Sequence, residues 1–140
     1  MAIDHDGLFK ELLTTFFYEF LTAFAPQVAG QLAPSPLVFL DKEQLATIVD
    51  PGRRETDIVA LAQLPGQQAT ILIHLEHQAQ RDRATARRMF RYFARFYDRY
   101  DTPIYPIVLC SYPSPLAPAP TAHRMDVLGE PVLDFRYRVI

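Results

Sequence analysis

Apolar residues recur every three to four positions in two segments of the chain, and this period predicts two amphipathic helices. The first helix is expected over residues 8–25. Its apolar positions are Leu8, Leu12, Phe16 and Phe20, with Leu13, Phe17 and Leu21 beside them. We expect Pro26 to end this helix and residues 27–36 to form a loop. The second helix is expected over residues 82–100, before Pro103. Its apolar stripe contains Met89, Phe93 and Phe96, with Phe90 and Tyr97.

Shorter apolar runs predict strands between and after these helices. The clearest are 56–64 (TDIVALAQL) and 69–78 (ATILIHLEHQ), which flank the turn-forming sequence Pro65-Gly66-Gln67-Gln68. Two strand-like runs around such a turn predict a β-hairpin. Further apolar runs predict strands at 45–49, 104–110 and 132–140, and another short apolar run lies at 37–40. Residues 112–122 are rich in proline and are expected to form an extended loop.

The order of these elements indicates one mixed α/β domain. A chain of 140 residues is long enough for a single domain with its own core. We expect a mixed sheet of about five strands with flanking helices. The last predicted strand runs to Ile140 with no cap or tail after it, so we expect residues 1–140 to be a domain that is truncated at its C-terminus.

Composition excludes several classes of protein. The single cysteine excludes a disulfide framework, an all-cysteine zinc site and an iron–sulfur cluster. No apolar run approaches the roughly 18 residues of a membrane span. The N-terminus has no basic region before an apolar stretch, so a signal peptide is not expected. We therefore expect a cytoplasmic protein without a membrane partner.

The net charge of −2 conceals a local excess of arginine. Seven arginines lie between Arg81 and Arg99. Four of them recur at four-residue spacing on one face of the second predicted helix: Arg87, Arg91, Arg95 and Arg99. Such a stripe is suited to the phosphates of a nucleic acid. The alternative is a solvated helix face, partly neutralised by Asp98 and Asp101.

Two carboxylates are expected to face each other across the predicted hairpin. Opposed residues of a hairpin share one sum of residue numbers, and for Asp57 and Glu76 this sum centres the hairpin between Gly66 and Gln67. Their Cβ atoms would then be about 5 Å apart. Gln78 would lie on the same side as Glu76, because side chains alternate along a strand.

Paired acids repel each other unless a cation or a proton lies between them. Carboxylate oxygens are the ligands that Mg²⁺ and Mn²⁺ prefer, so this pair is a candidate metal site. The alternative is that both acids lie in solvent at strand ends without a partner. A zinc site formed by His74, Glu76 and His77 is not favoured, because these three residues cannot all face one side of a strand.

The element order, with an Asp on one hairpin arm and E-x-Q on the other, resembles the PD-(D/E)XK nuclease superfamily, whose core is restriction-endonuclease-like. Four segments are more narrowly similar to the recombination-promoting nuclease and transposase-like family: HDGLFKELL, ETDIVAL, IHLEHQAQRD and RMFRYFARFYDRY. Together they span most of the chain, about residues 4–110.

This resemblance implies metal-dependent hydrolysis of phosphodiester bonds in DNA. Asp57 and Glu76 match the metal-binding acids, and the backbone carbonyl of His77 would be a further ligand by analogy. Glu11 on the first helix matches a position where an acid helps to hold metal or water, and its neighbour Lys10 could approach phosphate. Gln78 stands where the superfamily usually has lysine. A neutral amide can orient water but supplies no positive charge.

Other functions stay open at this point. The missing lysine also fits a catalytically inactive module that binds nucleic acid or protein. A phosphodiesterase that acts on RNA or on small molecules would use the same side chains. A homodimer is left open as a further partner state.

Overall fold

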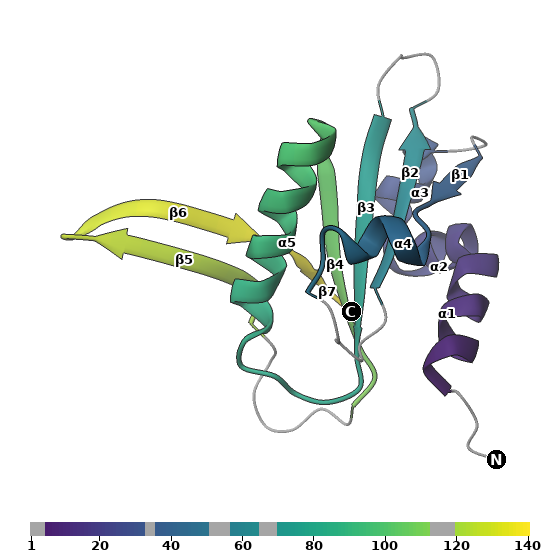
Figure 1. Cartoon of the computed structure of the whole chain (residues 1–140), viewed down its shortest axis with the longest axis horizontal. Helices are drawn as coiled ribbons and strands as arrows, with labels where there is room; N and C mark the ends of the chain where they lie inside the picture. Colours follow the sequence, from purple (N-terminus) through teal and green to yellow (C-terminus); the bar gives the residue numbers. More distant parts are fainter. Residues whose placement is uncertain (1–4, 33–35, 51–56, 65–69, 113–119) are drawn as a thin grey trace.

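The chain forms a five-stranded mixed sheet with helices on both faces, and a two-stranded hairpin extends away from it (Figure 1). This computed structural model describes residues 5–32, 36–50, 57–64, 70–112 and 120–140. The helices are α1 (His5–Thr15), α2 (Phe17–Phe24), α3 (Pro26–Leu32), α4 (Lys42–Ala46) and α5 (Thr85–Tyr100). The strands are β1 (Leu37–Phe39), β2 (Asp57–Gln63), β3 (Thr70–Gln78), β4 (Ile104–Cys110), β5 (Ala122–Val127), β6 (Glu130–Arg136) and β7 (Arg138–Val139).

The main sheet has the strand order β1-β2-β3-β4-β7. The pairs β1–β2 and β2–β3 are antiparallel, whereas β3–β4 and β4–β7 are parallel. Helix α5 connects β3 to β4, as a parallel pair requires a crossover between its strands. The prediction of a mixed α/β fold with a sheet of about five strands is therefore confirmed.

The register predicted for the central hairpin is also confirmed. Asp57 is paired with Glu76 across β2 and β3. The residue numbers of paired residues have the same sum along the whole hairpin, up to the pair Gln63 and Thr70. The predicted turn at 65–68 lies outside the described residues. This register matters because it places two acidic side chains on one face at one end of the sheet.

The first predicted helix, 8–25, is in fact two helices, α1 and α2, and the segment 27–36 predicted as a loop contains most of a third, α3. The break between α1 and α2 falls at Phe16, whose backbone (φ −112°, ψ 30°) is not helical. Pro26 begins α3 instead of ending a helix, which is a favourable position because proline has no N–H to satisfy in the first turn. The buried line is Leu13, Phe17 and Leu21, whereas Leu8, Leu12 and Phe16 are exposed.

Residues 45–49, predicted as a strand, lie in and after the short helix α4. Asp41 caps this helix: its Oδ1 accepts from the Gln44 N–H at 2.8 Å, and the Gln44 side chain accepts from the Asp41 N–H at 2.9 Å. This reciprocal capping box satisfies two free amides and favours a helical turn. Leu45 and Ile48 then pack towards β2 and α5.

Predictions for the second helix and the following strand are largely confirmed. Helix α5 begins three residues later than expected and ends at Tyr100, where Asp101 adopts a left-handed backbone (φ 46°). Its fully buried apolar side chains are Met89, Tyr92 and Phe96, whereas Tyr97 from the predicted stripe is half exposed. Strand β4 has the predicted bounds, Ile104–Cys110.

The C-terminal part differs from the single strand predicted at 132–140. It contains the hairpin β5–β6 and the short strand β7. The hairpin turns at Leu128 and Gly129, both with positive φ, which is typical of tight turns between twisted strands. Of the proline-rich segment 112–122, residues 113–119 lie outside the described part of the chain.

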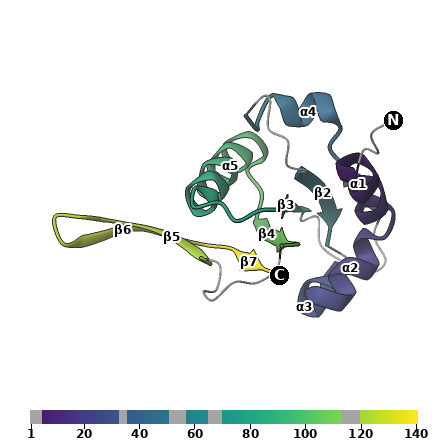
Figure 2. The same cartoon turned by 90° about the horizontal axis from the view of Figure 1, so that it is seen from below.

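Different groups of helices cover the two faces of the sheet (Figure 2). On one face, α1, α2 and α3 pack against residues such as Ile58, Ala60 and Ile73. On the other face, α4 and α5 pack against Val59 and Leu72. No helix in the described part of the chain is long and apolar enough to cross a membrane.

Candidate functional site

Two buried carboxylates lie side by side where β2 begins and β3 ends. Asp57 and Glu76 are directly paired, so both side chains point to the face of the sheet that α5 covers. Asp57 is 6% exposed and Glu76 has no exposed surface. The alternative of two unpartnered acids in solvent is therefore wrong. A buried ionised carboxylate is costly unless charge and hydrogen bonds compensate it.

Arginine from α5 compensates the charge of Glu76. Arg88 donates from Nε to Oε1 at 3.2 Å and from Nη2 to Oε2 at 3.1 Å. The same guanidinium donates from Nη1 to Oδ2 of Asp82 at 2.7 Å. A two-point contact of this kind fixes the plane of the carboxylate as well as its charge. Arg88 thus joins β3 to the segment that leads into α5.

The predicted site residue Gln78 lies within the same network. Its Nε2 donates to Oε2 of Glu76 at 3.1 Å and also to the hydroxyl of Thr85, the first residue of α5. The Thr85 hydroxyl in turn donates to the backbone carbonyl of Asp82 at 2.7 Å. Both amide hydrogens of Gln78 are therefore engaged, and its carbonyl oxygen is the group that could accept from a further donor.

Asp57 has a different partner. Nε2 of His74 donates to Oδ1 of Asp57 at 3.1 Å, because a carboxylate can only accept. The His74 ring is fully buried beside Tyr92 and Phe96. Oδ2 of Asp57 makes no hydrogen bond to the described residues. The two acids thus form one pair with two separate sets of partners.

The His77 side chain points to the opposite face of the sheet. Its ring stacks on Phe9 of α1 with centroids 4.2 Å apart, and Nε2 lies 2.7 Å from the hydroxyl of Ser111. His74 and Glu76 face α5 instead. The expectation that these three side chains do not share one side of the strand is confirmed, and only the backbone of His77 stays with Glu76.

Helix α1 carries a lysine, Lys10, that feels the charge of Asp57. Burial lowers the pKa of Lys10 below its usual value, the Asp57 carboxylate acts in the opposite direction, and Lys42 lowers it further. The charge of Asp57 therefore acts on Lys10, whereas the expectation that Lys10 approaches phosphate stays a prediction. Glu11, the next residue, is exposed, and within the described ranges its side chain forms no hydrogen bond or ion pair with either acid.

The four predicted arginines of α5 fall into two pairs. Arg87 and Arg91 are exposed and have no hydrogen-bond or ion-pair partner within the described ranges. Arg95 donates to the Ile48 carbonyl at 2.9 Å and to Asp50 at 3.0 Å, and it lies over the Tyr92 ring. Arg99 donates to the Thr47 hydroxyl at 2.9 Å. The first pair is therefore open to a ligand, whereas the second pair also holds the segment after α4.

The carboxylate pair fits a hard divalent cation in its chemistry. It offers oxygen ligands from two acids, and its environment already stabilises a cationic group, the Arg88 guanidinium. No set of three or more His, Cys, Asp or Glu side chains in the described part of the chain is arranged to hold a metal. The protein would supply two carboxylates and backbone oxygen. This is the pattern of Mg²⁺, which keeps several of its waters.

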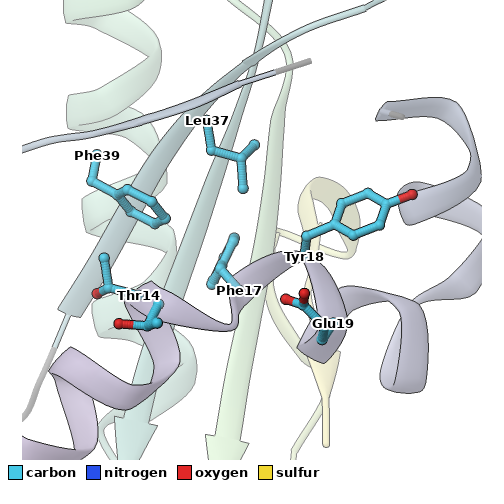
Figure 3. Close-up of a pocket in the computed structure, with 7 residues that line it drawn as sticks. Thr14, Phe17, Tyr18, Glu19, Leu37 and Phe39 are labelled. Carbon is cyan, nitrogen blue, oxygen red and sulfur yellow. The ribbon is translucent and has the colours of Figure 1, made fainter. Parts of the chain in front are cut away.

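A separate cavity of about 450 Å³ lies between the α1–α2 junction and β1 (Figure 3). Phe17, Leu37 and Phe39 converge on it, and Glu19 and Tyr18 lie at its side. The described residues of its lining are mainly apolar and include one carboxylate, Glu19, so they do not provide the paired acids found at the end of β2 and β3. The carboxylate pair on the α5 side is the better candidate for catalysis.

The sequence did not lead us to expect Arg88 in the site, or His74 as a hydrogen-bond partner of Asp57. A signal for Arg88 was present, because it lies three residues after Thr85 and four before Tyr92, which places it on the buried side of α5. An arginine on the buried face of a helix needs an anionic partner. Glu76 is that partner.

Comparisons with known proteins give no further assignment: no protein-family model, no curated protein and no solved structure matches this chain.

Proposed function

We propose that this chain is a nuclease that hydrolyses phosphodiester bonds in DNA with Mg²⁺ or Mn²⁺. The observation that carries the proposal is the direct pairing of two buried acids, Asp57 and Glu76, beside Gln78. The order of elements adds support, because a helical segment, β1, the hairpin β2–β3, α5 and a parallel β4 resemble the restriction-endonuclease-like core of the PD-(D/E)XK nucleases.

Asp57 and Glu76 would hold the metal, together with the backbone carbonyl of His77. The bound ion would activate water and neutralise charge on the phosphodiester. Gln78 would orient the water through its carbonyl oxygen, because its amide hydrogens are used by Glu76 and Thr85. Glu11, which is exposed on α1, would help to hold the metal or a water, as the family resemblance implies.

Positive side chains around the acids would bind the DNA backbone. Lys10 of α1 feels the charge of Asp57, and Arg87 and Arg91 are exposed along α5. Guanidinium groups match the geometry of phosphate oxygens and hold them in a fixed orientation. Arg95 and Arg99 would contribute only by exchanging their present contacts with residues 47–50 for phosphate.

The test is nicking of supercoiled plasmid by the wild-type protein and by Glu76→Gln, each with Mg²⁺, Mn²⁺ or chelator. Metal-dependent nicking by the wild-type protein alone supports the proposal. Equal nicking by the two proteins would remove Glu76 from the site. Absence of nicking by both, with intact DNA binding, would favour the second candidate function.

That second candidate is a catalytically inactive module that binds nucleic acid. The observation in its favour is the contact between Arg88 and both oxygens of Glu76, which already compensates the buried charge without a metal. Such a module would bind DNA in a salt-dependent way in the presence of chelator. Binding would require Arg87 and Arg91.

A further inference from the structure

We propose that Arg88 exchanges partners when a divalent cation binds: it releases Glu76 and stays on Asp82. This inference rests on the proposed metal site. It assigns Arg88 a role as a positioning residue that controls access of the cation to Glu76.

The first step of the argument is that Arg88 has two carboxylate partners in different surroundings. Nε and Nη2 donate to Glu76, which is fully buried, whereas Nη1 donates to Asp82, whose side chain is 37% exposed. One guanidinium therefore bridges the interior of the site and its outer edge. It can leave the inner carboxylate and keep a charged partner at the outer one.

The second step is that Arg88 and a metal would use the same oxygens. Oε1 of Glu76 accepts from Nε, and Oε2 accepts from both Nη2 and the Gln78 amide. A carboxylate has about four lone-pair positions, so these bonds occupy most of them. A divalent cation placed on the same carboxylate would also repel the guanidinium across a short distance away from water. Exchange removes this repulsion.

The third step concerns the donors that exchange releases. Nε and Nη2 of Arg88 would lose their acceptors on Glu76, and both would be next to the proposed reaction site. Guanidinium N–H groups pair well with phosphate oxygens. The same movement that opens Glu76 to the cation would therefore present two donors to a phosphodiester.

The test compares Mn²⁺ binding by Arg88→Gln and Arg87→Gln, measured by isothermal titration calorimetry at one ionic strength. Arg87 is the matched control, because it is the adjacent arginine, it is exposed, and its loss changes the net charge equally. We expect Arg88→Gln to bind Mn²⁺ about tenfold more tightly than Arg87→Gln, since the cation no longer displaces two charge-assisted hydrogen bonds. Equal or weaker binding by Arg88→Gln would overturn the exchange.

A second pair of variants gives the opposite sign and keeps the test decisive if Arg88→Gln does not fold. Asp82→Asn weakens the outer partner, so Arg88 should hold Glu76 more firmly and Mn²⁺ should bind several-fold more weakly than to Asp98→Asn. Asp98 is an exposed acid of α5 and controls for the change in charge. Equal affinities in this pair would contradict the exchange.

The same titrations separate this inference from the proposed function. If the wild-type protein and Arg88→Gln bind Mn²⁺ equally and Glu76→Gln does not, the metal site stands and the exchange is wrong. If neither the wild-type protein nor any of the variants binds Mn²⁺, the proposed function and the exchange are both wrong.

Discussion

Arg88 binds both carboxylate oxygens of Glu76, at 3.1 and 3.2 Å, from a helix that follows Glu76 in the chain. The Glu76 side chain has no exposed surface, and that of Arg88 is 14% exposed. This contact joins β3 to α5 at the end of the sheet where Asp57 also lies. Because Glu76 belongs to the candidate site, a change in this ion pair should alter both the site and the stability of the fold.

Loss of one partner should destabilise the protein, because the other charge stays buried. We expect Glu76→Gln and Arg88→Gln each to lower the free energy of unfolding by about 3 kcal/mol. In the double variant, the decrease in the free energy of unfolding should be about 2 kcal/mol smaller than the sum of the decreases in the two single variants. Urea denaturation measures all three values.

The matched control for this cycle is the ion pair between Arg95 and Asp50, whose side chains are 44% and 53% exposed. Its coupling energy should be below about 1 kcal/mol, because water screens an exposed pair. Equal coupling energies for the two pairs would contradict the account of Arg88 as a buried counter-ion.

Tyr137 should make the fold sensitive to high pH. Burial, and then the Glu76 carboxylate, raises the pKa of Tyr137 to about 12 from an ordinary value of 10.0. A group with a raised folded pKa stabilises the fold below the unfolded pKa, and this contribution is lost as the pH rises towards the folded value. Melting temperatures of the wild-type protein should therefore fall between pH 10 and about 12 more steeply than those of Tyr137→Phe.

The same variant should not be destabilised near neutral pH. The Tyr137 hydroxyl is buried and has no hydrogen-bond partner among the described residues. Removal of a buried polar group without a partner costs little and can stabilise a protein. A loss of more than about 1 kcal/mol in Tyr137→Phe would indicate that this hydroxyl has a partner.

The arginines of α5 should separate by function. We expect the double variant Arg87→Gln/Arg91→Gln to bind duplex DNA more weakly and to lower the slope of log affinity against log salt concentration by about 2, one for each lost phosphate contact. Its stability should match that of the wild-type protein, because both side chains are exposed. Fluorescence anisotropy with labelled duplex measures the slope.

Arg95→Gln/Arg99→Gln is the matched control, with the same change in charge on the same helix. Arg95 and Arg99 form hydrogen bonds with residues 47–50, so this variant should lower the free energy of unfolding by up to about 1 kcal/mol. It should reduce the slope of log affinity against log salt concentration by less than Arg87→Gln/Arg91→Gln does. An identical effect of the two double variants on DNA binding would contradict this separation.

The parts of the fold that sequence predicted well depend on local pattern. In β2 and β3, turn residues and apolar runs determine the register, so the pairing of Asp57 with Glu76 followed from arithmetic. Strand β4 and most of α5 were also predicted, because each has a strong period or a continuous apolar run.

The predictions of the fold that were wrong concern segments where weak local signals compete with packing. The period of apolar residues continues through Phe16, yet the helix breaks there, and Leu13 and Phe17 become the buried residues. Residues 45–49 are apolar, but the capping box of Asp41 and Gln44 directs Leu45 into a helix. The capping sequence D-x-x-Q was a readable signal for that helix.

For the candidate site, sequence could place the acids but not their partners. Arg88 and Glu76 are separated by twelve residues and meet only because α5 crosses over β3 and β4. His74 and Asp57 meet because alternate residues of β3 face β2 residues on the same side of the sheet. Such contacts follow from tertiary structure and leave little trace in local spacing.

The most direct test of the central claim is Mn²⁺ binding by Asp57→Asn. Asparagine keeps an acceptor for His74 and removes only the charge, and Asp126→Asn in the exposed strand β5 is the matched control. If Asp57 and Glu76 hold a divalent cation, calorimetry will show binding by the wild-type protein and by Asp126→Asn, and binding about tenfold weaker or worse by Asp57→Asn. Equal binding by Asp57→Asn and the wild-type protein would contradict the account.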